Sequence, residues 1–358
     1  MVSSFTAKQL NSNDNVLVSS CGKRQWQGIP GIERAANGRL WCTFFSGGSK
    51  EPHVDNEILL TTSMDDGKSW REPEVIASAP GNTRAFDPCL WHDPNDKLWL
   101  FYNLSNIEQP RHQIMAMTTT DSDKENPVWL EPFEIELSLP FAFRLNKPTV
   151  TTQGVWLLPV TWSKEPLPIK EGQEIWLEAE NQLQGVAISR DQGASWIFRG
   201  ALKAPCWALE NMIVEKNNGT LWMLIRTGDG WLWESFSEDQ GTTWAEAAPS
   251  QIANPGSRFH IRRLKSGKLL LINHANFSKS DDNQNGRNNL AMMLSGDDGQ
   301  TWSEPLILDS RNNVSYPDAI EGPEGIINIV HDRERGTIGE ILFCRIHENN
   351  KMREISKK

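Results

Sequence analysis

The chain has 358 residues, and its 38% hydrophobic and 23% charged content is typical of a globular protein with a substantial core. The formal net charge of −10 at pH 7 and the isoelectric point near 5.3 argue against nucleic acid and anionic membranes as the main partner. A basic pocket for a small anionic ligand remains compatible with this balance.

Six short apolar segments, each entered through a tight turn, are distributed along the whole chain. Their turns and first residues read Gly38–Trp41, Asp96–Trp99, Gly154–Leu157, Gly219–Trp222, Gly267–Leu270 and Gly325–Asn328. The spacing of roughly 50–65 residues is the length that a four-stranded blade needs. We therefore interpret each segment as one strand of a repeated β unit.

A second repeat, Ser-x-Asp-x-Gly-x-x-Trp, lies between these segments. It occurs at 63–70, 189–196, 237–244 and 295–302, with a degenerate copy at 119–129. An alternating apolar run precedes the copies and a polar turn follows, which indicates strand, turn, strand. The Asp can accept hydrogen bonds from backbone amides, the Gly supplies a positive φ, and the Trp can pack back on the hairpin. We expect this element to be architectural and not catalytic.

The two repeats predict an all-β fold, a six-bladed β-propeller with four-stranded blades, as a single domain over residues 1–358. No segment has a long apolar period of 3.6 residues, so we expect little helix. Residues 163–183 are expected to form a long loop at the rim.

The Ser-x-Asp-x-Gly-x-x-Trp element is the Asp box, or BNR repeat, of the sialidase (neuraminidase) superfamily, which the chain resembles over nearly its full length. The resemblance implies an exo-acting glycoside hydrolase, with an exo-α-sialidase as the first hypothesis. Such an enzyme removes a terminal acidic sugar, a sialic acid or a related one, from a glycan. The resemblance also implies that a tyrosine is the nucleophile and that no cofactor or metal takes part.

Several residues match the family's site motifs. Glu210 and Arg226 bound the segment ENMIVEKNNGTLWMLIR, as the family's glutamate and a following arginine do. Arg287 precedes the last Asp box, where the family has another arginine. Tyr316, one of only two tyrosines in the chain, lies in Val-Ser-Tyr-Pro-Asp, where the family has its nucleophile.

The chain departs from the family in its first blade. The family has a Phe/Tyr-Arg-Ile-Pro motif there, but this chain reads Gln-Gly-Ile-Pro with Gly28 in place of the arginine. Arg24, just upstream, is a candidate substitute. Glu51 and Asp55 are both candidates for the acid/base in the loop ahead of the first box. Arg258, in the basic stretch 257–263, is a candidate for additional anion binding.

These residue types suit hydrolysis of an acidic glycoside. A phenol, with a pKa of about 10, is a poor nucleophile until a nearby carboxylate takes its proton, the role expected of Glu210. A neutral tyrosine is not repelled by a substrate carboxylate, whereas an Asp or Glu nucleophile is. Planar guanidinium groups on Arg226 and Arg287 can bind that carboxylate in a bidentate manner.

Other functions remain open on the same fold. The chain can be a propeller glycosidase or a uronate lyase for another sugar, or a non-catalytic carbohydrate-binding propeller. The start of the chain, MVSSFTAKQLNSN, has no signal-peptide pattern and no stretch is long and apolar enough to span a bilayer. We thus expect a cytoplasmic protein without a membrane span, or a periplasmic or secreted one if a native leader was removed. Nothing in the sequence indicates the oligomeric state.

Overall fold

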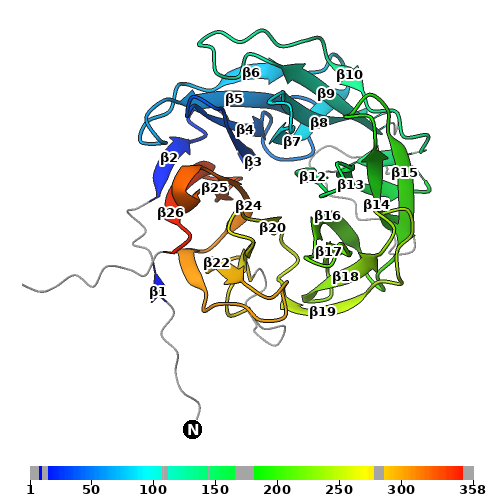
Figure 1. Cartoon of the computed structure of the whole chain (residues 1–358). Coiled ribbons are helices and arrows are strands. Elements are labelled where there is room, and N and C mark those ends of the chain that lie inside the picture. The colour runs from blue at the N-terminus through cyan, green and yellow to red at the C-terminus, as the bar shows by residue number, and fades with distance from the viewer. Residues whose placement is uncertain are drawn as a thin grey trace, which may run out of the picture.

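The computed structural model describes residues 8–9, 15–106, 108, 112–139, 141–143, 146–165, 181–277 and 286–349. In these residues, six sheets stand around a central axis (Figure 1). The arrangement confirms the predicted all-β, six-bladed propeller. None of the helices in the described ranges is long and apolar enough to cross a membrane. Most of the expected rim loop, residues 166–180, lies outside the described residues.

The first three blades follow the chain in order. Blade 1 contains β3 (Gln27–Arg34), β4 (Leu40–Ser46), β5 (Glu57–Ser63) and β6 (Glu74–Ala77). Blade 2 contains β7 (Thr83–His92), β8 (Leu98–Asn106), β9 (His112–Thr119) and β10 (Phe133–Glu134). Blade 3 contains β11 (Phe141–Phe143), β12 (Thr149–Val150), β13 (Trp156–Ser163), β14 (Gln182–Ser189) and β15 (Ile197–Leu202). Its innermost strand is divided into β11 and β12, because both pair with β13.

The last three blades complete the ring. Blade 4 contains β16 (Ala208–Glu215), β17 (Leu221–Thr227), β18 (Trp231–Ser237) and β19 (Ala248–Ala253). Blade 5 contains β20 (His260–Arg263), β21 (Leu269–His274), β22 (Leu290–Ser295) and β23 (Leu306–Asp309), with β1 (Lys8–Gln9) parallel to β23. Blade 6 contains β24 (Val314–Glu321), β25 (Ile326–Arg333), β26 (Glu340–His347) and β2 (Val16–Ser19). A short 3-10 turn, η3 (Pro323–Gly325), precedes β25.

A strand near the N-terminus closes the ring. Strand β2 precedes blade 1 in the chain but pairs antiparallel with β26, as the outermost strand of blade 6. The segment that leads into blade 1 is thereby held to the last blade by backbone hydrogen bonds, which closes the ring. This closure was not predicted from the sequence.

The core consists of apolar layers between neighbouring blades. Clusters of buried side chains lie at all six blade-to-blade contacts. Tryptophans supply much of this packing: Trp91 and Trp156 meet edge to face across blades 2 and 3, with ring centroids 4.9 Å apart. The high tryptophan content is therefore explained largely by the repeated blade interface.

The Asp boxes are hairpin turns, as predicted. In the first box, Ser63 donates a hydrogen bond to Asp65, which also accepts from the amide and the hydroxyl of Ser69 at 2.9 and 2.6 Å. These hydrogen bonds lower the pKa of Asp65 to about 2. The same contacts recur at Asp191, Asp239 and Asp297.

The direction of the strands separates two faces of the ring. Each box joins the third and fourth strands of its blade, and successive strands are antiparallel, so the boxes lie at the end where the inner strands finish. We name this end the box face. The opposite end, where the inner strands begin, is the entry face. It receives the loops between second and third strands and the connections between blades.

Replacement of Gly67 by alanine tests the role of box packing. Gly67 has φ +83°, and an added Cβ would lie 2.1 Å from Cε1 of Phe343 in blade 6. We expect Gly67→Ala to lower the free energy of unfolding by about 1–2 kcal/mol through backbone strain and by about 1–3 kcal/mol more through overpacking. Gly219→Ala is the matched control, because Gly219 has φ +85° and nothing within 4 Å of its Cβ position. Equal losses for the two variants in chemical denaturation would contradict this account.

Candidate active site

The predicted site residues come from different blades but share one end of the ring. Glu210 and Tyr316 lie near the starts of the inner strands β16 and β24, and Arg226 lies near the end of β17. Arg287 lies in the connection between β21 and β22. All of these positions are on the entry face, because of the strand directions given above.

Tyr316 is the centre of this group. Its side chain is almost fully buried, and four guanidinium carbons lie within 6 Å of its ring centroid. They belong to Arg335 at 4.7 Å, Arg226 at 5.7 Å, Arg287 at 5.8 Å and Arg258 at 5.9 Å. Four cations around one aromatic ring favour the approach of an anionic ligand.

Arg226 connects Tyr316 with Glu210. Its Nη1 donates to the Tyr316 hydroxyl at 3.0 Å and to Oε2 of Glu210 in a short ion pair. Its Nε donates to the carbonyl of Gly256 at 2.8 Å. Both side chains of the ion pair are almost completely buried. Glutamate, arginine and tyrosine thus form one continuous polar unit.

Arg287 shares an anchor with Arg226. Its Nη2 donates to the same Gly256 carbonyl at 3.1 Å, so one backbone oxygen holds both guanidinium groups. Burial, together with the neighbouring charge of Arg226, lowers the pKa of Arg287. An anion between the two arginines would relieve this repulsion.

β-Bulges direct the central side chains toward the axis. The register of β24 shifts between Ser315 and Asp318, and Tyr316 has φ 52°. The register of β16 shifts around Glu210, which has φ 49°. A left-handed conformation costs a non-glycine residue about 1–2 kcal/mol, and bulges commonly re-aim a side chain at a functional site.

The phenol of Tyr316 is neutral at ordinary pH. Burial raises the pKa of Tyr316, and the charge of Glu210 acts in the same direction, while Arg226, Arg335 and Arg287 oppose the shift. A neutral phenol needs a base before it can act as a nucleophile.

The two predicted acid/base candidates lie in different surroundings. Glu51 is largely buried and accepts a hydrogen bond at 2.9 Å from Nη1 of Arg335. The Asp55 side chain is 72% exposed and lies beside His53, with 3.5 Å between Oδ2 and Nδ1. Glu51 is therefore linked to the arginine group, and Asp55 faces solvent.

The two remaining predicted arginines differ in position. Arg258 is buried and contributes to the group around Tyr316. Arg24 donates to Ser19 and Gln27 instead, at 3.0 and 3.2 Å, and is not among the described arginines within 6 Å of the Tyr316 ring.

Three residues of this region were not predicted from the sequence. Arg335 lies in the connection between β25 and β26 and is the nearest of the four guanidinium groups to Tyr316. The ring of Trp207 lies 5.2 Å from the guanidinium carbon of Arg226. Asp87 has φ 49° at a bulge of β7, the same place in its blade as Tyr316 in blade 6. Its sequence signal was Asp87-Pro88, which parallels Tyr316-Pro317.

A buried ionic cluster joins residues of blades 1, 3, 5 and 6. Nζ of Lys147 donates to Glu33 at 2.7 Å and lies 3.2 Å from Asp318, which pairs with His260 at 3.0 Å. Burial raises the pKa of Glu33, but the neighbouring Lys147 and His92 outweigh this effect and hold the pKa at about 2. These ion pairs link the inner strands of several blades.

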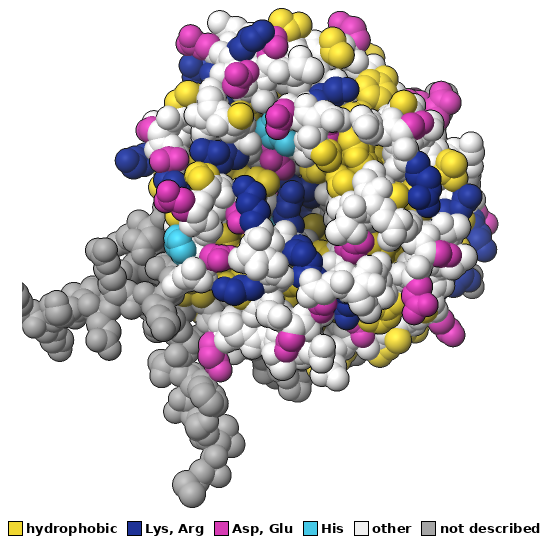
Figure 2. Space-filling model, in the orientation of Figure 1, with side chains coloured by type: hydrophobic (Ala, Val, Ile, Leu, Met, Phe, Trp, Pro, Cys, Tyr) yellow, Lys and Arg dark blue, Asp and Glu magenta, His cyan; other side chains and the backbone are white. Residues whose placement is uncertain are grey.

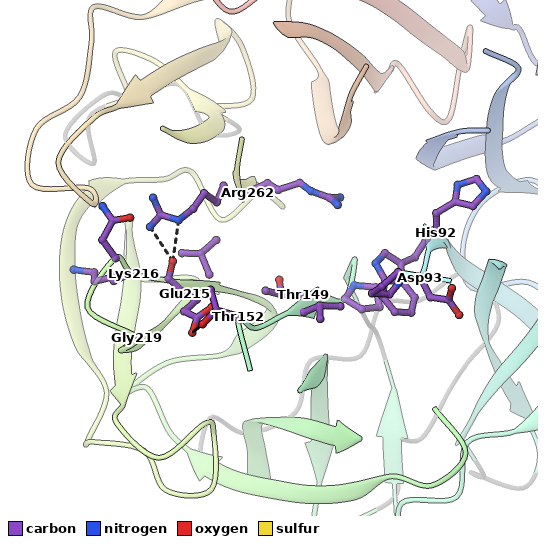
Figure 3. A pocket seen from close by; sticks show the side chains of 15 residues that line it. His92, Asp93, Thr149, Thr152, Glu215, Lys216, Gly219 and Arg262 are labelled. Carbon is purple, nitrogen blue, oxygen red and sulfur yellow. Dashed lines mark hydrogen bonds between the residues drawn. The ribbon is translucent and has the colours of Figure 1, made fainter. Parts of the chain in front are cut away.

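A cavity of about 530 Å³ opens on the box face. Figure 3 shows its lining, in which Arg262 extends across the cavity in the direction of His92. Arg263 donates to the Glu215 carbonyl at 3.0 and 2.8 Å. Lys and Arg side chains also gather around the central hollow in the view of Figure 2. None of the predicted site residues lines this cavity, so it is separate from the group around Tyr316.

In the described ranges, no group of three or more His, Cys, Asp or Glu side chains is placed to hold a metal.

Solved structures with this fold include several sialidases. The Hadza microbial sialidase Hz136 is 17% identical with a TM-score of 0.73, covering 93% of this chain and 68% of its own. The intramolecular trans-sialidase of Ruminococcus gnavus, in complex with oseltamivir carboxylate, is 15% identical with a TM-score of 0.68, covering 93% and 96%. The sialidase of Trypanosoma rangeli, in a covalent intermediate with 2,3-difluorosialic acid, is 16% identical with a TM-score of 0.66, covering 89% and 54%.

Sequence comparisons give the family. No curated protein matches the chain significantly. The family model of the BNR repeat-like domain matches residues 38–329, which is most of the chain. The chain therefore belongs to the BNR repeat-like domain family, and it shares its propeller fold with the sialidases named above.

Proposed function

We propose that this protein is an exo-acting glycoside hydrolase of the sialidase type, which removes a terminal acidic sugar from a glycan. The observation that carries the proposal is the polar unit of Glu210, Arg226 and Tyr316 inside a group of arginines. The sialidase-like fold and the covalent intermediate in the T. rangeli enzyme add support. A sialic acid or a related acidic sugar is the proposed substrate class.

In the first step, the phenolic oxygen of Tyr316 attacks the anomeric carbon as the bond to the leaving oxygen breaks. Glu210 takes the phenolic proton, and Arg226, which contacts both side chains, holds them in position. A carboxyl group donates a proton to the leaving oxygen. Water then attacks the anomeric carbon and gives a proton to the carboxylate that protonated the leaving oxygen. The bond between the anomeric carbon and the Tyr316 oxygen breaks, and Tyr316 recovers its proton from Glu210. Two displacements give net retention of configuration.

Arg226 and Arg287 are the proposed ligands for the sugar carboxylate. Both are fixed by the Gly256 carbonyl, so little side-chain entropy is lost when an anion binds. Their planar donors suit bidentate hydrogen bonding to a carboxylate. A buried, neutral tyrosine between them can approach an anionic sugar without charge repulsion.

Asp55 is the proposed acid/base. A terminal sugar is bound deepest in an exo-acting site, so its leaving group lies toward solvent. The exposed Asp55 suits proton delivery there. Glu51 is hydrogen-bonded to Arg335 and is better placed to orient that arginine.

Replacing Tyr316 by phenylalanine removes the nucleophilic oxygen and keeps the ring. We expect hydrolysis of an aryl sialoside to fall by at least about 10³-fold, while affinity for the free acidic sugar changes by less than about tenfold. Tyr102→Phe, at the other tyrosine of the chain and also buried, is the matched control and is expected to retain activity.

Assays on a panel of aryl glycosides, with ultraviolet detection of unsaturated products, separate the alternatives. A Tyr316→Phe variant as active as wild type would contradict the proposed nucleophile. An unsaturated product would identify a uronate lyase. Binding without turnover in wild type would identify a carbohydrate-binding propeller.

Asp55→Asn and Glu51→Gln distinguish the two carboxylates. If Asp55 protonates the leaving oxygen, Asp55→Asn should lower kcat/KM by about 10²–10⁴-fold for a glycan leaving group. The loss should be much smaller for a nitrophenyl leaving group, which needs little protonation. Glu51→Gln should affect both substrates equally. The reverse pattern in the two variants would assign the acid/base role to Glu51.

A further inference from the structure

Arg335 lies where the first blade lacks its expected arginine. An added Cβ on Gly28 would lie 2.3 Å from Cδ and 2.8 Å from Cγ of Arg335. The aliphatic part of Arg335 thus occupies the space that a side chain at position 28 would enter. The guanidinium group, at the end of that stem, lies 4.7 Å from the Tyr316 ring centroid.

Close approach, and not backbone conformation, explains the glycine at position 28. Gly28 is absent from the positive-φ glycines, so its main chain would accept any side chain. The obstacle is the Arg335 stem, together with Oδ2 of Asp332 at 3.0 Å from the Cβ position. A shorter side chain at position 335 would therefore make room for a longer one at position 28.

Two acidic residues hold Arg335 in this place. Its Nη1 donates to Glu51 of blade 1 at 2.9 Å, and its Nε lies 3.8 Å from Asp332. Asp332 also accepts hydrogen bonds from the Ile29 amide at 2.8 Å and from Ser315 at 2.6 Å. The residue that follows Gly28 and the residue that precedes Tyr316 are thus fixed by the carboxylate that supports Arg335.

Arg335 also lies near the arginines assigned to carboxylate binding. Its guanidinium carbon and those of Arg226 and Arg287 are 4.7, 5.7 and 5.8 Å from one ring centroid. A guanidinium group has five N–H donors, so an arginine supported by acids can also donate to a ligand.

We propose that Arg335 completes a three-arginine carboxylate site with Arg226 and Arg287, and that Gly28 is a glycine in order to admit it. This inference rests on the proposed function, because it assigns a binding partner for the acidic group of the same substrate. Gly28 belongs to blade 1, whereas Arg335 belongs to blade 6. The arginine that completes the site therefore comes from the neighbouring blade.

Calorimetric titration with a free sialic acid and with its methyl ester tests this proposal. Arg335→Ala should weaken binding of the acid by about 10- to 100-fold and leave binding of the ester unchanged. Gly28→Arg combined with Arg335→Ala should restore most of the affinity, because the new side chain enters the vacated space. Gly28→Ala should weaken binding of the acid in wild type and have no effect in the Arg335→Ala background.

Two single variants serve as comparisons. Arg345→Ala removes an arginine of the same blade that pairs with Asp66 in the first Asp box, on the box face, and should bind the acid like wild type. Arg24→Ala tests the upstream arginine as the alternative. Both variants also report any general effect of arginine removal on folding, through their thermal unfolding curves.

Four results would overturn the proposal. Three concern the variants: unchanged acid binding in Arg335→Ala, equal losses for acid and ester, or the predicted loss in Arg24→Ala instead. The fourth is a wild-type protein that does not prefer the acid to the ester. If wild type binds the acid through Arg335 but hydrolyses no acidic glycoside, the proposed function fails and the assignment of Arg335 stands.

Discussion

The contact of Arg226 with both Glu210 and Tyr316 is the interaction on which the site depends. One guanidinium nitrogen donates to both side chains, and both are buried, so neither can be removed without leaving a desolvated polar group. Arg226 brings a carboxylate to a phenol, and under the proposed function it also adds positive charge where an anionic sugar would lie. The second arginine, Arg287, is positioned through the carbonyl that anchors the first.

The propeller fold positions these side chains by local distortion of its inner strands. In blades 1, 2, 4 and 6 the register of the inner strand shifts near its start, on the entry face. Tyr316, Glu210 and Asp87 all have positive φ values at such bulges. Repeated packing on the box face, by Asp boxes and tryptophans, is remote from these bulges. The stable repeat and the strained residues therefore lie at opposite ends of the same strands.

Local repeats made most of the fold predictable. Asp boxes and turn-entered strands act within a few residues, so their spacing indicates the number of blades. Glu210, Arg226, Arg287 and Tyr316 could be proposed from the sequence because each lies in a short stretch that matches a family motif, and the structure brings them to one face. The contacts that close the ring were not, because they join distant segments: the Ile29 amide donates to Asp332, 303 residues away. Arg24 was the candidate substitute for the arginine absent at position 28 because it lies close in sequence. Of Arg24 and Arg335, it is Arg335 that lies near Tyr316.

Mass spectrometry of the protein after reaction with a fluorinated acidic sugar is the most direct test of the central claim. Fluorine next to the anomeric carbon slows both displacements by destabilising the oxocarbenium-like transition state, and a reactive leaving group lets the first proceed. We expect a covalent adduct on the peptide that contains Tyr316, in wild type and not in Tyr316→Phe. An adduct on Glu210, Asp55 or Glu51, or no adduct with an acidic sugar that the enzyme hydrolyses, would contradict a tyrosine nucleophile.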